Sequence, residues 1–207
     1  LGRWPWPRST HADLIDALRV AGAAVIAMPM IFAEPDPEPG RDAALAGADG
    51  IEVGIPFSDP VMDGPVIQRA SDEALVAGAT PPGILDDLSR LDVSVPLAVM
   101  TYANLVYRFG WERFAATMIA SGVSAAILPD IPLEESGPWC AAADAAGVET
   151  VMLAAPTAPD DRLQRVVGRA GGFVYAVGLL GITGERDELA SSAKVIARRL
   201  KDATDKP

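Results

Sequence analysis

Residues 51–65 read IEVGIPFSDPVMDGP, an apolar run typical of a β-strand, followed by a loop punctuated with proline and glycine. The run carries a carboxylate at Glu52, and the loop carries two more at Asp59 and Asp63. A carboxylate inside an apolar strand is costly in free energy unless it is paired or protonated. Glu52 therefore needs either a compensating partner or a chemical task.

Apolar runs of this kind recur along the whole sequence. Each is short and lacks polar alternation, which is typical of strands covered on both faces. Segments with helical spacing lie between them, and several end on glycine. This alternation predicts right-handed β-α-β units with a parallel sheet. The predicted strands are 23–32, 50–55, 95–101, 124–128, 149–155 and 172–177, and the predicted helices are 12–22, 40–47, 65–78, 81–91, 110–122, 133–147, 158–171 and 188–203.

Composition and charge argue against several classes of protein. Half of the residues are apolar, so a sizeable core is expected, and we predict a single domain over residues 1–207. The formal net charge of -11 makes nucleic acids and anionic membranes poor partners. One cysteine, Cys140, and one histidine, His11, favour a reducing cytoplasm over a disulfide-bonded protein or a histidine-rich metal site.

Six strands that alternate with helices allow two architectures. An open doubly wound sheet often has a glycine-rich phosphate loop after its first strand, but IFAEPDPEPG at 31–40 is acidic and has no such motif. In a TIM-type (β/α) barrel, functional residues follow the carboxyl ends of several strands. The polar candidates fall at such positions, and they are Glu52, Asp63, Tyr102, Asn104, Asp130, Tyr175 and Thr183. The sequence therefore predicts an α/β barrel, with about six of the usual eight units in this chain.

Four segments resemble the α subunit of tryptophan synthase, in order and with near-family spacing. They are IEVGIPFSDPVMDGPVIQRASDEALVAGAT at 51–80, VMTYANLVYRFG at 99–110, ILPDIPLEES at 127–136 and GFVYAVGLLGITGERDEL at 172–189. The resemblance implies a lyase of tryptophan biosynthesis that splits indole-3-glycerol phosphate into indole and glyceraldehyde 3-phosphate without a cofactor. It also implies transfer of indole to a β subunit in an α2β2 heterotetramer.

Glu52 and Asp63 match the family's catalytic glutamate and aspartate. The retro-aldol cleavage needs a proton delivered to indole C3, a proton removed from the side-chain hydroxyl, and stabilisation of charge at the ring nitrogen. Burial would raise the pKa of Glu52, suiting it as acid and base, whereas Asp63 in an accessible loop would stay ionised and accept the indole N–H. Without the family context, Glu52 could instead pair with an arginine, and Asp63 could be a turn residue before Gly64.

Four more residues are candidates for substrate binding. Tyr175 matches a site-lining tyrosine of the family, although a lone aromatic more often belongs to a core. Thr183 and Gly184 lie in a segment with the features of a lid, for which an ordinary strand-to-helix loop is the alternative. Asp130 resembles a position beside the indole, or it caps a helix beginning at residue 133.

The family resemblance places four residues near the β subunit. Asp59 and Pro60 would belong to a loop facing that partner, although an Asp-Pro pair is commonly a simple turn. Tyr102 and Asn104 match family residues near the path to the partner, and Asn104 could instead cap a turn.

The sequence also departs from the family. After KDATDKP at 201–207 it shows no counterpart of the family's last two strand units, which supply most of the phosphate-binding N–H groups, so we expect weak binding of a phosphate ester. The competing hypothesis is a catalytically deficient barrel that binds or activates a β subunit. Another barrel enzyme of indole or histidine biosynthesis is disfavoured because every lysine lies from residue 194 onward.

Overall fold

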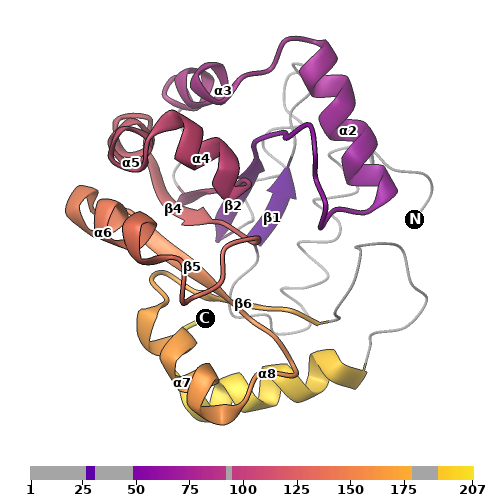
Figure 1. Ribbon diagram of the computed structural model, residues 1–207, viewed down its shortest axis with the longest axis vertical. Coiled ribbons are helices and arrows are strands. Elements are labelled where there is room, and N and C mark those ends of the chain that lie inside the picture. Colours follow the sequence, from indigo (N-terminus) through magenta and orange to yellow (C-terminus); the bar gives the residue numbers. More distant parts are fainter. Residues whose placement is uncertain (1–26, 31–48, 92–94, 179–190) are drawn as a thin grey trace.

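The computed structural model describes residues 27–30, 49–91, 95–178 and 191–207. Within these ranges six strands form a parallel sheet, in which each strand pairs with its neighbours in sequence order. The sheet curls, and the helices lie around its outside (Figure 1). The strands are β1 (Ala27–Met30), β2 (Gly50–Gly54), β3 (Leu97–Met100), β4 (Val123–Ile127), β5 (Glu149–Ala154) and β6 (Val174–Ala176).

The described helices follow the strands as the repeating pattern requires. They are α2 (Pro65–Val76), α3 (Pro81–Leu88), α4 (Ala103–Phe109), α5 (Trp111–Ala120), α6 (Gly137–Ala146), α7 (Asp160–Arg169) and α8 (Ser191–Ala203). Helix α7 shows how the sequence fixes them. It begins with Asp160 and Asp161, ends with Arg169, and so carries charges that favour the dipole at both ends. None of the described helices is long and apolar enough to cross a membrane.

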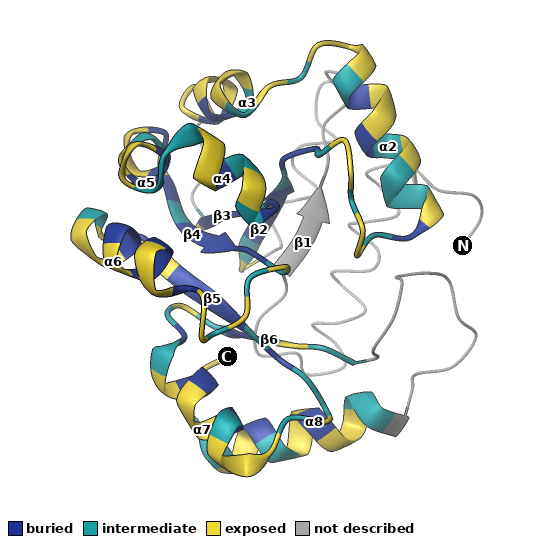
Figure 2. Cartoon of the chain, viewed as in Figure 1, coloured by how far each residue is buried: buried dark blue, intermediate teal, exposed yellow. Residues whose placement is uncertain are grey.

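The main core lies between the sheet and the helices. Val53 and Val99 of the strands are almost completely buried against Phe114, Met118 and Trp139 of the helices. Helix surfaces facing outward remain exposed, whereas the strands are largely buried (Figure 2). Burial of large apolar side chains on this outer face of the sheet is the main favourable contribution to folding.

The inner face of the sheet carries smaller side chains and the first candidate carboxylate. Ala98, Ala125, Ile127 and Val151 form a separate buried cluster, against which the partly buried Tyr175 packs. Glu52 of β2 pairs in register with Ala98 of β3, so the two side chains point to the same face of the sheet. The fold therefore directs Glu52 into the interior of the curled sheet.

The predicted α/β alternation is confirmed wherever the structure describes it. The last five predicted strands are found with ends shifted by two residues at most, and β1 lies within the predicted run 23–32. The predicted helices 12–22 and 40–47 lie outside the described residues. The single domain over residues 1–207 stays a prediction.

Two details of the predicted elements are wrong. The sequence reading placed no helix at 103–109, where the structure has α4. The helix expected to begin at residue 133 begins instead at Gly137, with Pro138 in its first turn. Proline is favoured at the start of a helix because its missing N–H would have no partner there.

Candidate active site

Glu52 is a buried carboxylate in the middle of β2. Its side chain is only 5% exposed, between the buried Ile51 and Val53. Desolvation by burial raises the pKa of Glu52 to about 7. In the described part of the chain, no arginine or lysine forms an ion pair with it. Near neutral pH this group can therefore exist in both its acid and its base form.

Asp63 lies in the loop between β2 and α2, and its carboxylate is held from a second loop. The hydroxyl of Tyr102 donates a hydrogen bond to Asp63 Oδ2 at 3.0 Å. The side-chain amide of Gln68 donates to the Asp63 carbonyl at 2.9 Å, which fixes the backbone. Asp63 is half-buried rather than fully exposed, and desolvation raises its pKa, while the Tyr102 hydrogen bond opposes that rise.

The hydroxyl of Tyr175 is close enough to both Glu52 and Asp63 to be affected by their charges. Tyr175 is partly buried on β6, opposite Leu153 of β5. Burial raises the pKa of Tyr175, and the negative charges of Glu52 and Asp63 raise it further. Because both carboxylates act on one phenol, the structure brings these three groups to the same region of the barrel interior.

Tyr102 is held inside the fold by contacts with the loop after β2. It is the N-cap residue of α4, it is only 6% exposed, and its ring lies 5.1 Å from that of Phe57. Its hydroxyl also accepts a hydrogen bond from the Met62 N–H at 3.0 Å. Burial, together with the charges of Asp63 and Asp130, raises the pKa of Tyr102 to about 12. The role near the partner that the resemblance implies for Tyr102 stays a prediction.

Asp130 does not cap a helix beginning at residue 133, since α6 begins at Gly137. Its Oδ1 instead accepts a hydrogen bond from the backbone N–H of Ala103 at 2.8 Å. Ala103 is the first residue of α4, so Asp130 satisfies a free N–H of a helix that follows a different strand. Asn104, the next residue of that helix, is exposed.

The loop before Asp63 forms a local turn. The carboxylate of Asp59 accepts a hydrogen bond from the Ser58 hydroxyl at 2.7 Å, and the Val61 N–H donates to the Asp59 carbonyl at 2.9 Å. The Asp63 N–H donates to the carbonyl of Pro60 at 3.1 Å. Val61 is 75% exposed despite its apolar side chain. The turn and an accessible partner-facing loop are thus compatible, and the partner role of Asp59 and Pro60 stays a prediction.

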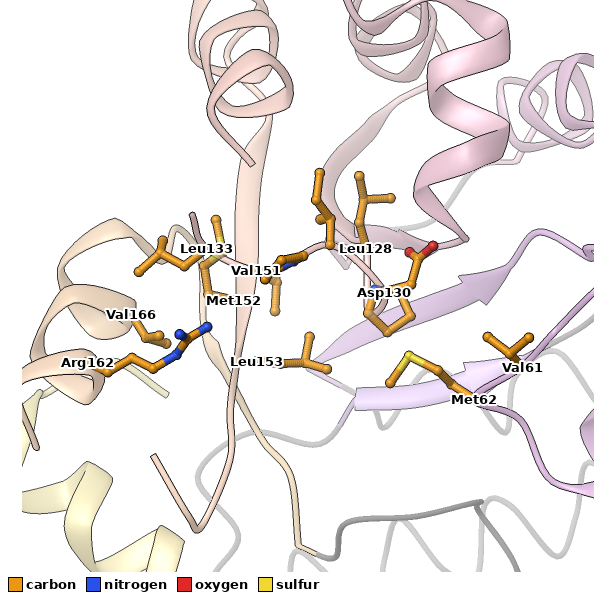
Figure 3. A pocket seen from close by; sticks show the side chains of 13 residues that line it. Val61, Met62, Leu128, Asp130, Leu133, Val151, Met152, Leu153, Arg162 and Val166 are labelled. Atoms are coloured by element: carbon orange, nitrogen blue, oxygen red, sulfur yellow. The ribbon is translucent and has the colours of Figure 1, made fainter. Parts of the chain in front are cut away.

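A cavity of about 440 Å³ lies between the loops after β2 and β4, strand β5 and helix α7. Figure 3 shows Asp130 and Met62, the latter from the β2–α2 loop, on one side of it and Arg162 on the opposite side. Most of the lining is apolar, including Leu128 and Leu153, and neither Glu52 nor Asp63 lines it. Its size and lining suit a small molecule with an apolar ring.

Some predicted features lie outside the described residues. Thr183 and Gly184 fall in the segment 179–190, so their substrate-binding roles stay predictions. Among the residues that are described, no three histidine, cysteine or acidic side chains are grouped to hold a metal ion.

Sequence reasoning missed the links between the loops. The polar residues Tyr102 and Asn104 were interpreted as parts of a loop, although ANLVYRF contains the apolar spacing of two helical turns. The contacts of Tyr102 with Asp63 and of Asp130 with Ala103 join residues 39 and 27 positions apart. No local pattern announces such contacts.

Comparisons with known proteins agree with the resemblance. A family model described as "Tryptophan synthase alpha chain" matches residues 41–207. The tryptophan synthase alpha chain of Thermobifida fusca is 45% identical over 159 residues, which are 76% of this chain and 59% of that protein. The chain thus spans less than two thirds of the length of this relative.

Solved structures give the same result for the fold. A tryptophan synthase structure from Mycobacterium tuberculosis matches with a TM-score of 0.77 and 33% identity, covering 94% of this chain and 77% of that one. A chain from the tryptophan synthase α2β2 complex of Pyrococcus furiosus matches with a TM-score of 0.77 and 35% identity, covering 88% and 75%. The predicted TIM-type barrel class is confirmed by these similarities and by the curled parallel sheet.

Proposed function

Because the chain belongs to the tryptophan synthase alpha chain family, we propose that it is a lyase that cleaves indole-3-glycerol phosphate into indole and glyceraldehyde 3-phosphate. The observation that carries this proposal is the pair of carboxylates in different settings. Glu52 is buried and near its titration midpoint at neutral pH, and Asp63 is half-buried on the adjoining loop.

Glu52 would act as acid and then as base. In its protonated form it delivers a proton to C3 of the indole ring, which turns the ring into an electron acceptor. As a carboxylate it then takes the proton of the side-chain hydroxyl while the bond from C3 to the side chain breaks. The electrons of that bond return to the ring, so indole and an aldehyde leave and Glu52 is protonated again. A group with a pKa near 7 serves both directions of proton transfer.

Asp63 would stabilise the positive charge that protonation at C3 creates at the ring nitrogen. Its carboxylate accepts the indole N–H, and the hydrogen bond from Tyr102 favours the charged form that this task needs. The division of work between one neutral and one ionised carboxyl group follows from their environments. Protonation at C3 supplies the electron sink, so the proposed reaction uses no cofactor.

The remaining substrate contacts are proposed from the fold and the resemblance. Tyr175 would lie against the substrate, since it shares the barrel interior with Glu52 and Asp63. The apolar inner face of the sheet, where Leu153 and Tyr175 pack, would receive the indole ring. Asp130 lines the neighbouring cavity, and Thr183 and Gly184 would complete the site from the segment after β6.

We also propose a tryptophan synthase β subunit as partner and the cytoplasm as location. The family relationship and the α2β2 complex formed by the P. furiosus protein support this assembly. The loop with the exposed Asp59 and Val61 and the half-buried Pro60, together with the exposed Asn104, offers surface for it at the mouth of the barrel. A biosynthetic family and a single buried cysteine, Cys140, fit a reducing compartment.

The test is to incubate the folded chain with indole-3-glycerol phosphate, alone and with a β subunit from a relative, and to measure both products. We expect indole and glyceraldehyde 3-phosphate in equal amounts, with a faster rate when the β subunit is present. Absence of both products in the presence of the partner would contradict the proposal. If the chain accelerated only the reaction of the β subunit, the alternative of a catalytically deficient scaffold would replace it.

A further inference from the structure

We propose that Asp130 is a positioning residue, which acts through the start of α4 and the side chain of Tyr102 to hold the carboxylate of Asp63 in place. The inference rests on the proposed function, in which Asp63 receives the indole N–H. It assigns to Asp130 a task beyond lining the substrate cavity.

The first link is the contact between Asp130 and α4. This helix has seven residues, and its N-cap residue, Tyr102, makes no capping hydrogen bond with its own side chain. The N–H of Ala103 is instead satisfied by Asp130 Oδ1 at 2.8 Å, across 27 positions of sequence. A carboxylate at a helix N-terminus is favoured both by this hydrogen bond and by the helix dipole. Asp130 therefore fixes the backbone next to Tyr102.

The second link is the side chain of Tyr102. Tyr102 directly precedes Ala103 in the chain. Its side chain is buried, with the ring against that of Phe57. Its hydroxyl accepts the N–H of Met62 and donates to Asp63 Oδ2, both at 3.0 Å. The Tyr102 hydroxyl thus bridges the backbone N–H of Met62 and the carboxylate of Asp63. Because Tyr102 is attached to α4, a shift of α4 would move this hydroxyl and with it the Asp63 carboxylate.

The two links join the loops that follow β2, β3 and β4. Asp130 belongs to the loop after β4, Tyr102 to the segment after β3, and Asp63 to the loop after β2. Tyr102 is buried, whereas Asp130 is exposed. The hydrogen bond that the exposed Asp130 makes to α4 therefore affects, through Tyr102, the half-buried carboxylate of Asp63.

The direction in which the pKa of Asp63 changes when Asp130 is truncated distinguishes a positioning role from a direct electrostatic effect. Removing a nearby negative charge lowers the pKa of a carboxyl group, because its ionised form is then less repelled. Loss of the hydrogen bond from Tyr102 raises the pKa of Asp63, because that bond favours the ionised form. A positioning role therefore predicts a rise after Asp130 is truncated, and a direct charge effect predicts a fall.

The experiment is a titration of the Asp63 carboxyl carbon by NMR in the free full chain, with the signal assigned by its loss in Asp63→Asn. We expect Tyr102→Phe and Asp130→Ala each to move the midpoint upward. Asp130→Asn keeps an oxygen that can accept the Ala103 N–H, so it should bring the midpoint back toward that of the wild type. Asp130→Ala added to Tyr102→Phe should cause no further rise, because both changes break one path.

The matched control is Asp161→Ala, which removes an exposed carboxylate from the first turn of α7 at the same end of the barrel. It should leave the midpoint of Asp63 where it is. Glu52 and Tyr175, the further titratable groups that share this region among the described residues, stay unchanged in all these variants. Circular dichroism of each variant checks that the fold is kept, and Asp130→Asn supplies the comparison if Asp130→Ala unfolds.

A fall or no change of the midpoint in Asp130→Ala, or an equal rise in the Tyr102→Phe background, would overturn the inference. The titration needs no turnover, so this outcome is separate from a failure of the proposed function, which shows as absence of indole. Where indole is formed, Asp130→Ala should lower kcat about fivefold, no more than Tyr102→Phe does, with little change in KM, and loss of a direct substrate contact would instead raise KM.

Discussion

The hydroxyl of Tyr102 lies 3.0 Å from Oδ2 of Asp63, and the two residues are 39 positions apart in the chain. The contact ties the segment after β3 to the loop after β2, on the side of the sheet to which Glu52 and Tyr175 also belong. A barrel mouth can therefore hold a carboxylate in a fixed place although the carboxylate itself lies on a loop.

Tyr102→Phe should weaken the proposed reaction mainly by disturbing Asp63. A hydrogen bond to a charged group contributes roughly 1.5–3 kcal/mol, and the half-exposed setting of Asp63 reduces this, so we expect a five- to tenfold lower kcat/KM. The acidic limb of the pH profile should move to higher pH, because the pKa of Asp63 rises without the hydrogen bond. Steady-state assays of indole formation at several pH values measure both effects.

The control for this variant is Tyr107→Phe. Tyr107 lies on the same helix, α4, and is 65% exposed. Removal of its hydroxyl should leave the rate and the pH profile as they are. Equal rates and equal pH profiles for Tyr102→Phe and Tyr107→Phe would mean that the hydrogen bond from Tyr102 to Asp63 does not contribute to the reaction.

Glu52→Gln should change how stability depends on pH. The pKa of Glu52 is about 7 in the folded chain against an ordinary value of 4.5, so between these values the folded state holds a proton that the unfolded state has lost. The stabilising effect of that proton is fully present below pH 4.5 and is lost as the pH rises through about 7. The wild type should thus lose roughly 3 kcal/mol relative to Glu52→Gln over this range.

Urea unfolding of both proteins at pH 5 and pH 7.5 measures this difference in free energy. Glu149→Gln provides the control, because Glu149 is an exposed carboxylate at the start of β5. A constant difference between wild type and Glu52→Gln at both pH values would mean that Glu52 is not desolvated.

Two glycine substitutions should change stability in opposite directions. Gly147 ends α6 with φ 80°, a left-handed conformation, so Gly147→Ala should destabilise the fold by about 1 kcal/mol. Gly168 lies within α7 in open space, so Gly168→Ala should stabilise it by about 0.5 kcal/mol. Thermal unfolding of the two variants beside the wild type measures the effect. Equal changes of Tm would show that the conformation at residue 147 is not left-handed.

The strands were predictable because each is an apolar run without alternation, covered on both faces. The run at 149–155 and β5, Glu149–Ala154, differ by one residue. Helix α4 was not predictable with the same ease, since seven residues give too few turns for a clear periodicity. The start of α6 was misplaced although Pro138 marks it, because the acidic residues from 134 were interpreted as part of the helix.

The candidate site was predictable to the same uneven degree. A carboxylate in an apolar strand identified Glu52, and the structure places that side chain in the interior. The setting of Asp63 and the cap that Asp130 provides depend on contacts between distant loops, which only the folded arrangement of neighbouring strands creates. Asp130 was a candidate site residue or a cap for a helix beginning at residue 133. In the structure its carboxylate accepts the N–H of Ala103, at the start of α4.

The most direct test of the central claim is the rate of indole release from indole-3-glycerol phosphate across pH 5–9, in the presence of a β subunit, for the wild type and Glu52→Gln. We expect the wild-type rate to fall as the pH rises through about 7, where Glu52 loses its proton, and the variant to be at least about a hundredfold slower throughout. A folded Glu52→Gln protein that releases indole as fast as the wild type would contradict the account.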